Sequence, residues 1–299
     1  METTWELFDS WHGDEIIAEK ESGLFLTRAD AGRFTHQDAH FDISGRFNVP
    51  RSPQGRPVIF QAGDSEEGRE FAASSADAIF SRHGTLAEGR PFYADVKGRL
   101  AKYGRTPDQL LILPAATFVL GDTDADAAEL ARVVRRQQVS GPTAIAFLEQ
   151  LWNRDLSGYD PDGPLPDVDP DLGEHTIARG RASVRMYRDP MATAAEWRAK
   201  AEAEKLSIRD LIIEVTGRQT FIGSPSTVAG AINHLVQADA SDGFILVPHI
   251  TPGGLDEFAD RVVPMLQERG VFRTEYEGST LREHLGLAPL DAAAAKAAS

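Results

Sequence analysis

Short apolar runs alternate with helical patterns over the middle of the chain. A run typical of a buried strand covers Pro57–Gly63, and similar runs follow at Ala76–Phe80 and Gln109–Pro114. Apolar residues recur at helical spacing over Ala87–Tyr103 and Ala125–Gln138. Strands that alternate with helices in this way predict βαβ units and a parallel sheet, so the expected fold class is α/β.

Residues that favour helix ends place the boundaries of several elements. Gly104 is expected to stop the helix before it, and Asp122 or Thr123 to cap the helix that begins near Ala125. Later in the chain, Ser224 is a good N-cap, and Pro225 suits the first position of a helix.

The alternation lapses in residues 141–220. Residues 155–173 are rich in Asp, Pro and Gly, which predicts an excursion from the sheet, closed by helices near Ala192–Glu204 and Ser207–Val215. After it, the pattern predicts a last strand at Asp242–Val247 and a helix at Gly254–Gly270.

The two ends of the chain have weaker patterns. A helix is expected over Trp5–Trp11, and Phe25–Phe47 is expected to be irregular with one short strand near His40–Ile43. We expect one domain over residues 1–287 and a disordered tail over residues 288–299.

Composition excludes several kinds of protein. Of the 299 residues 41% are apolar, enough for a sizeable core, and a net charge of -15 argues against a nucleic-acid partner. The absence of cysteine excludes disulfides and thiolate chemistry. No signal peptide and no run of eighteen apolar residues occurs, so we expect a cytoplasmic protein with no membrane partner.

The turn Gly63-Asp64-Ser65 is the clearest candidate for a ligand site. A glycine at the end of a strand lets the backbone approach a ligand, and a helix that begins at Ser65 turns free N–H groups and its positive end outward. These features predict an anion site. The alternative is that Ser65 or Asp64 is only an N-cap, which any βα unit shows.

Four segments together resemble one family of flavin enzymes. They are RSPQGRPVIFQAGDSEEG (51–68), FIGSPSTVA (221–229), DGFIL (242–246) and VVPMLQERGVFRTEYEGSTLREHLGL (262–287). In sequence and order they are similar to the bacterial luciferase-like flavin monooxygenases, in the group of nitrilotriacetate monooxygenase component A, dibenzothiophene-sulfone monooxygenase and pristinamycin synthase. The resemblance implies a (β/α)8 TIM barrel with residues 141–220 as a late helical insertion. Because the pattern contains only about four βα units, we expect a partial, C-terminal barrel that lacks its first half.

The resemblance also implies a reaction. It predicts an FMN-dependent monooxygenase component of a two-component system, in which a separate flavin reductase supplies reduced FMN and O2 oxidises a small organic substrate. We also expect a homo-oligomer. The alternatives are a non-catalytic half-barrel remnant or interaction protein without a complete flavin site, and a deazaflavin-using relative, which the C-terminal signature disfavours.

The resemblance assigns few residues to the site. Ser65 matches the serine that contacts the FMN phosphate in that family, with Asp64 and Gly63 beside it in the turn. His249 follows the last strand and is a candidate for the substrate pocket, and His175 in the excursion is a weaker one. No catalytic side chain can be assigned.

Other polar residues are expected to be structural. We expect structural hydrogen bonds for Gln54 and Gln61, and a packing role for Asp242 at the start of its strand. No His-Glu-x-x-His spacing occurs, and the acidic residues of 160–171 lack the pattern of a calcium loop, so no metal is expected.

Overall fold

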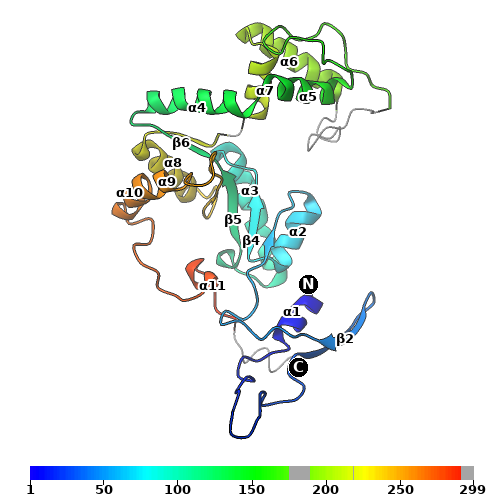
Figure 1. The fold of residues 1–299 in the computed structure, drawn as a ribbon, viewed down its shortest axis with the longest axis vertical. Helices are drawn as coiled ribbons and strands as arrows, with labels where there is room; N and C mark the ends of the chain where they lie inside the picture. Colours follow the sequence, from blue (N-terminus) through cyan, green and yellow to red (C-terminus); the bar gives the residue numbers. More distant parts are fainter. Residues whose placement is uncertain (175–188, 218, 291–299) are drawn as a thin grey trace. The chain divides into compact units, whose positions relative to one another are not determined.

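The fold was analysed in a computed structural model that describes residues 1–174, 189–217 and 219–290. The chain divides into two compact units (Figure 1). The first unit comprises Met1–Ala116, Ala231–Leu246 and Leu266–Ser299, and the second comprises Thr117–Gly230 and Val247–Met265.

The first unit is built on a four-stranded sheet in the order β3-β4-β5-β8. Its strands are β3 (Phe60–Gln61), β4 (Ala78–Ser81), β5 (Leu111–Ala116) and β8 (Ile245–Leu246). Every pair is parallel, with Phe60 opposite Ala78 and Ala78 opposite Leu111. Parallel neighbours need long crossovers, and helices supply them here. The predicted parallel α/β arrangement is confirmed.

Two helices complete the core of the first unit. Helix α2 (Glu66–Ser75) follows β3, and α3 (Leu86–Arg99) follows β4 (Figure 1). Small residues of α2 and larger ones of α3 pack on the sheet in one buried cluster, which contains Ala72, Ala73, Ala76, Ile79, Phe92, Val96, Leu100, Leu110 and Ile112. Alanines in α2 allow that helix to lie close to its neighbours.

Helix α3 and the short helix that follows it end where the sequence predicts. The Thr85 hydroxyl accepts a hydrogen bond from the N–H of Glu88 and caps the first turn. At the other end the 3-10 helix η1 (Leu100–Tyr103) continues to Gly104, which has a φ of +66°. A left-handed residue of this kind is where glycine is favoured, so the predicted stop at Gly104 is confirmed.

The N-terminal segment contains more strand than expected. Helix α1 (Glu2–Asp9) is followed by the antiparallel hairpin of β1 (Arg33–Gln37) and β2 (Asp42–Arg46). The expectation of one short strand near His40–Ile43 was therefore wrong. Asp38 forms the turn, because its carboxylate accepts hydrogen bonds from the N–H groups of His40 and Phe41 at 2.7 Å. Both strands are mostly exposed, which removes the apolar alternation that reveals a strand.

The second unit contains the parallel pair β6 (Phe118–Leu120) and β7 (Phe221–Gly223). Helix α4 (Asp124–Gln138) begins with a capping box between Thr123 and Asp126, as its sequence predicts. Helix α8 (Pro225–Gln237) begins directly after β7. The carboxylate of Asp124 accepts the N–H of Ser224 at 2.7 Å, so an internal anion already lies at the start of α8.

Residues 141–220 contain a helical cluster with its own core (Figure 1). Helices α6 (Pro190–Glu204) and α7 (Ile208–Thr216) confirm the two predicted helices, and α5 (Gly141–Trp152) is an unpredicted third. Trp152 and Trp197 lie in this core with ring centroids 6.3 Å apart. The core accounts for the excursion from the sheet, because these helices bury their apolar faces against each other.

The remaining helices are short. They are η2 (Pro107–Gln109), α9 (Asp256–Arg261), α10 (Val263–Glu268) and α11 (Leu281–His284). The expectation of a single helix over Gly254–Gly270 was wrong. The helical segment is interrupted at Val262, because Pro264 has no N–H to donate to the carbonyl of Asp260 and the proline ring crowds that carbonyl. Over residues 1–174, 189–217 and 219–290, no helix combines the length and apolar character of a membrane span.

Candidate functional site

The predicted Gly63–Ser65 turn connects the carboxyl end of β3 to the start of α2. Ser65 is the N-cap of α2, with extended backbone angles (φ −70°, ψ 165°). Its hydroxyl oxygen accepts the N–H of Gly68 at 3.1 Å. The N–H groups of Glu66 and Glu67, in the first turn, have no acceptor within the helix itself. Ser65 is therefore a cap whose hydroxyl proton can still be donated to an anion.

Two glycines keep this turn close to the helix. A Cβ on Gly68 would lie 2.9 Å from both the carbonyl carbon and the carbonyl oxygen of Gly63. A Cβ on Gly63 would lie 3.3 Å from the Cα of Gly68 and would also meet the side-chain amide nitrogen of Gln61. The backbone of the strand end and that of the first helical turn approach each other where no side chain fits. Glycine is therefore required at both positions by the packing of the strand end on the first turn of α2.

Asp64 points its carboxylate into an ion-paired cluster. The carboxylate oxygens lie 3.0 Å from Nε2 of His83 and 3.3 Å from a terminal nitrogen of Arg69. Arg69 also donates to Asp95 at 2.9 Å, and both His83 and Arg69 lie against the ring of Phe92. The side chain of Asp64 is thus partnered inside the protein, and a direct role for it in cofactor binding stays a prediction.

Cations offset the negative side chains around the turn. Arg99 donates to both carboxylate oxygens of Glu66, at 2.7 and 3.0 Å, and these bonds lower the pKa of Glu66. Burial raises the pKa of Asp95, but hydrogen bonds from Arg69 and Arg99 outweigh it and hold the pKa below its usual value. Because Arg69 and Arg99 pair with these carboxylates, they reduce the repulsion that an incoming anion would meet at the start of α2.

Three residues that were expected to have structural roles accept hydrogen bonds from backbone N–H groups. The amide oxygen of Gln61 accepts the N–H of Gly63 at 2.8 Å, and that of Gln54 accepts the N–H of Arg282 at 3.3 Å. Asp242 accepts the N–H of Ile112 at 2.7 Å. These predictions are confirmed.

Asp242 links α3 to the sheet as well. Tyr93 donates its hydroxyl to Asp242 at 3.0 Å, and the ammonium of Lys97 lies 2.8 Å from the same carboxylate. Burial, together with the charge of Asp242, raises the pKa of the Tyr93 hydroxyl. Both features are consistent with packing rather than chemistry at the amino end of the last strand.

Neither candidate histidine lies in the described part of the first unit, to which the turn belongs. His249 belongs to the second unit, where its side chain is exposed. His175 lies outside the described residues. A pocket role for either histidine therefore stays a prediction. Across the described ranges, no group of three or more His, Asp or Glu side chains is placed to hold a metal ion.

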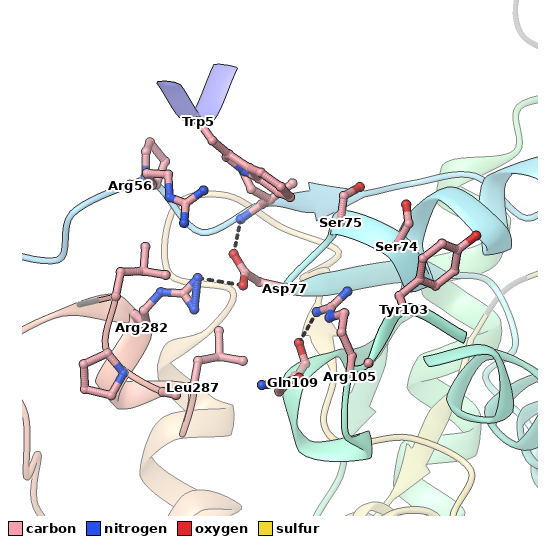
Figure 2. Close-up of a pocket in the computed structure, with 16 residues that line it drawn as sticks. Trp5, Arg56, Ser74, Ser75, Asp77, Tyr103, Arg105, Gln109, Arg282 and Leu287 are labelled. Atoms are coloured by element: carbon pink, nitrogen blue, oxygen red, sulfur yellow. Dashed lines mark hydrogen bonds and ion pairs between the residues drawn. The ribbon is translucent and has the colours of Figure 1, made fainter. Parts of the chain in front are cut away.

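A cavity of about 490 Å³ lies at the other ends of the same strands (Figure 2). Its lining includes Ile59, Asp77 and Gln109, which precede β3, β4 and β5, and Arg282 from α11. No local sequence pattern predicts this cavity, because its walls come from segments about two hundred residues apart.

Comparison with known proteins places these features in a family. The sequence profile of the family described as luciferase-like monooxygenase matches residues 22–242. Nitrilotriacetate monooxygenase component A of Aminobacter aminovorans is 37% identical over 96% of this chain and 61% of its own length. N-acetyl-S-(2-succino)cysteine monooxygenase of Bacillus subtilis is 36% identical over 94% of this chain and 61% of its own length. The chain thus spans about three fifths of the length of these relatives.

A solved structure supports the same relationship. Riboflavin lyase, crystallised with a modified FMN and riboflavin, superimposes with a TM-score of 0.67 and 28% identity. The alignment covers 97% of this chain and 60% of that one. The residues that the family profile matches, 22–242, contain the β3–α2 turn.

Proposed function

Since the chain belongs to the luciferase-like monooxygenase family, we propose that it binds FMN and takes part in the reduced-flavin-dependent oxygenation of a small organic substrate. The observation that carries the proposal is the Gly63–Ser65 turn at the start of α2, where bare backbone, a serine hydroxyl and outward N–H groups meet. At the start of α8, by contrast, the carboxylate of Asp124 already occupies the corresponding position.

Each residue of the turn has a distinct part in this proposal. Ser65 donates its hydroxyl proton to a phosphate oxygen while accepting from Gly68, and Glu66 and Glu67 contribute backbone N–H groups. Gly63 allows the strand end to pack closely on the first turn of α2, and Asp64 fixes the turn through Arg69 and His83. When bound, the reduced flavin supplies the chemistry with O2; the protein holds its phosphate and orients it.

The partners and the complete fold are part of the same proposal. A separate flavin reductase supplies the reduced FMN, and His249 lines the substrate pocket in a homo-oligomeric enzyme. The described strands form a C-terminal part of a (β/α)8 barrel, in which residues 141–220 are the helical insertion. The parallel pairing of both sheets and the separate core of α5, α6 and α7 support this arrangement.

A fluorescence titration with oxidised FMN tests the proposal. Ser65→Ala removes one hydrogen bond to the phosphate, worth about 1 kcal/mol, and should raise the Kd about fivefold. Ser207→Ala is the matched control, because the Ser207 hydroxyl also accepts an N–H three residues later at 3.1 Å, at the start of α7. The control separates loss of a helix cap from loss of a phosphate contact.

The outcomes separate the proposed enzyme from its alternative. A Kd that rises in Ser65→Ala and stays unchanged in Ser207→Ala supports the phosphate site. Equal effects of the two substitutions would reduce Ser65 to an ordinary cap. A wild-type chain that binds no flavin would favour the non-catalytic half-barrel remnant.

A further inference from the structure

The cavity at the amino ends of β3, β4 and β5 carries an excess of positive charge. Figure 2 shows Arg56 and Arg105 on either side of Asp77, with Arg282 reaching toward that carboxylate. Asp77 is already engaged, because it accepts the N–H of Ile59 at 2.9 Å and a guanidinium proton of Arg282 at 2.6 Å. The lining of the cavity thus contains three guanidinium groups and one carboxylate, in a protein whose net charge is -15.

Arg282 has a donor for which the residues that the structure describes provide no acceptor. Its side chain is 8% exposed, and its Nε–H is buried without a hydrogen-bond partner. Leaving a buried charged donor unsatisfied is costly, and such groups are uncommon in folded proteins. The guanidinium of Arg282 thus keeps hydrogen-bonding capacity that the described residues leave unused.

The other two arginines differ in how many of their guanidinium N–H groups already have an acceptor. Arg105 donates to four backbone carbonyls, among them those of Ala73 and Ala76 at the end of α2, and so contributes charge rather than free donors. Arg56 lies over the ring of Trp5, with its Nε 3.6 Å from the carboxylate of Asp9. Burial lowers the pKa of both Arg56 and Arg105, and the charges of Asp9 and Asp77 oppose this effect.

Apolar side chains form the remaining wall. Leu287, Pro289 and Leu290 also line the cavity, and its volume of about 490 Å³ lies in the range of small-molecule sites. We propose that the cavity binds a small organic anion, with a phosphate or carboxylate head group against Arg56 and Arg282 and an apolar body against this wall. It is a second site, because the Gly63–Ser65 turn follows the opposite, carboxyl end of β3.

Isothermal titration calorimetry of the whole chain with phenyl phosphate tests the proposal. We expect saturable binding of one molecule per chain, weaker binding of inorganic phosphate, and no binding of phenol. Arg282→Gln and Arg56→Gln should each raise the Kd at least about tenfold, the typical effect of one charged hydrogen bond. Arg273→Gln, an exposed arginine of the same unit, is the matched control and should leave the Kd unchanged.

Two variants guard against misreading the result. Arg282→Gln also breaks the ion pair with Asp77, so Arg56→Gln, which leaves that pair intact, decides the matter if the first variant unfolds. Ser65→Ala should not affect phenyl phosphate, and Arg56→Gln should not affect FMN. The proposal is overturned if phenyl phosphate does not bind, if both arginine variants bind as wild type, or if Ser65→Ala alone abolishes binding.

Discussion

Replacement of Gly68 by alanine probes the close approach on which the flavin site depends. Gly68 is the third residue of α2, and an added Cβ would lie 2.9 to 3.0 Å from three backbone atoms of Gly63. Ordinary contacts of a Cβ begin near 3.4 Å. Neither neighbour is the flexible end of a side chain, so the strand end and the helix must move apart by about half an ångström.

Two effects of opposite sign determine the stability of Gly68→Ala. Overpacking of a tight contact costs about 1–3 kcal/mol. Alanine favours a helix over glycine by up to about 1 kcal/mol, and by less in the first turn. We therefore expect a net loss of about 1–2 kcal/mol in the free energy of unfolding, together with weaker FMN binding because the turn is displaced.

Urea denaturation followed by circular dichroism measures this change. Gly98→Ala is the matched control, because Gly98 lies in α3 of the same unit and an added Cβ there meets nothing within 4 Å. The control should gain about 0.5–1 kcal/mol. If Gly68→Ala were stabilised to the same extent as Gly98→Ala, the close approach of Gly63 and Gly68 would have no energetic consequence and the reasoning would be refuted.

Three further changes test other parts of the structure. His36 lies between Asp38, at 3.0 Å, and Glu6, at 2.8 Å, and hydrogen bonds to these carboxylates raise its pKa. The contribution of protonated His36 to the free energy of unfolding should be complete below about pH 6.5, the pKa of histidine in the unfolded chain, and should disappear as the pH rises through the raised pKa. The urea midpoints of wild type and His36→Gln should therefore converge at high pH. A difference that stays constant with pH would contradict this. Asp242→Ala leaves three donors without their carboxylate and should lower the free energy of unfolding by about 2–3 kcal/mol, whereas a loss under about 0.5 kcal/mol would remove its structural role. Trp197→Ala should destabilise the helical core of residues 141–217 by about 3–5 kcal/mol, seen as faster hydrogen exchange in α5 and α7; unchanged exchange there would show that this core does not depend on Trp197.

Elements with strong local signals could be predicted from the sequence. The apolar runs indicated β3, β4 and β5, and caps such as Thr123 and Gly104 indicated helix ends, because each depends on neighbours a few residues away. The same local chemistry identified the Gly63–Ser65 turn as a candidate anion site.

Elements that depend on distant contacts could not be predicted in this way. The hairpin of β1 and β2 is largely polar, so no apolar alternation reveals its strands. Helix α5 was missed for another reason, because its local signals, a cap at Ser140 and Pro142 in the first turn, were present but not used. The cationic cavity joins Arg56 to Arg282, which are separated by most of the chain. Nothing in the sequence around either arginine indicates that both line one cavity together with Asp77.

A phosphate site at the start of α2 requires the protein to distinguish FMN from riboflavin, which lacks only the phosphate. Parallel fluorescence titrations with the two flavins measure this difference. We expect the wild-type chain to bind FMN more tightly than riboflavin, and Ser65→Ala to weaken FMN about fivefold while leaving riboflavin unchanged. Equal affinities of the wild-type chain for the two flavins, or equal losses of both in Ser65→Ala, would contradict a phosphate site in this turn.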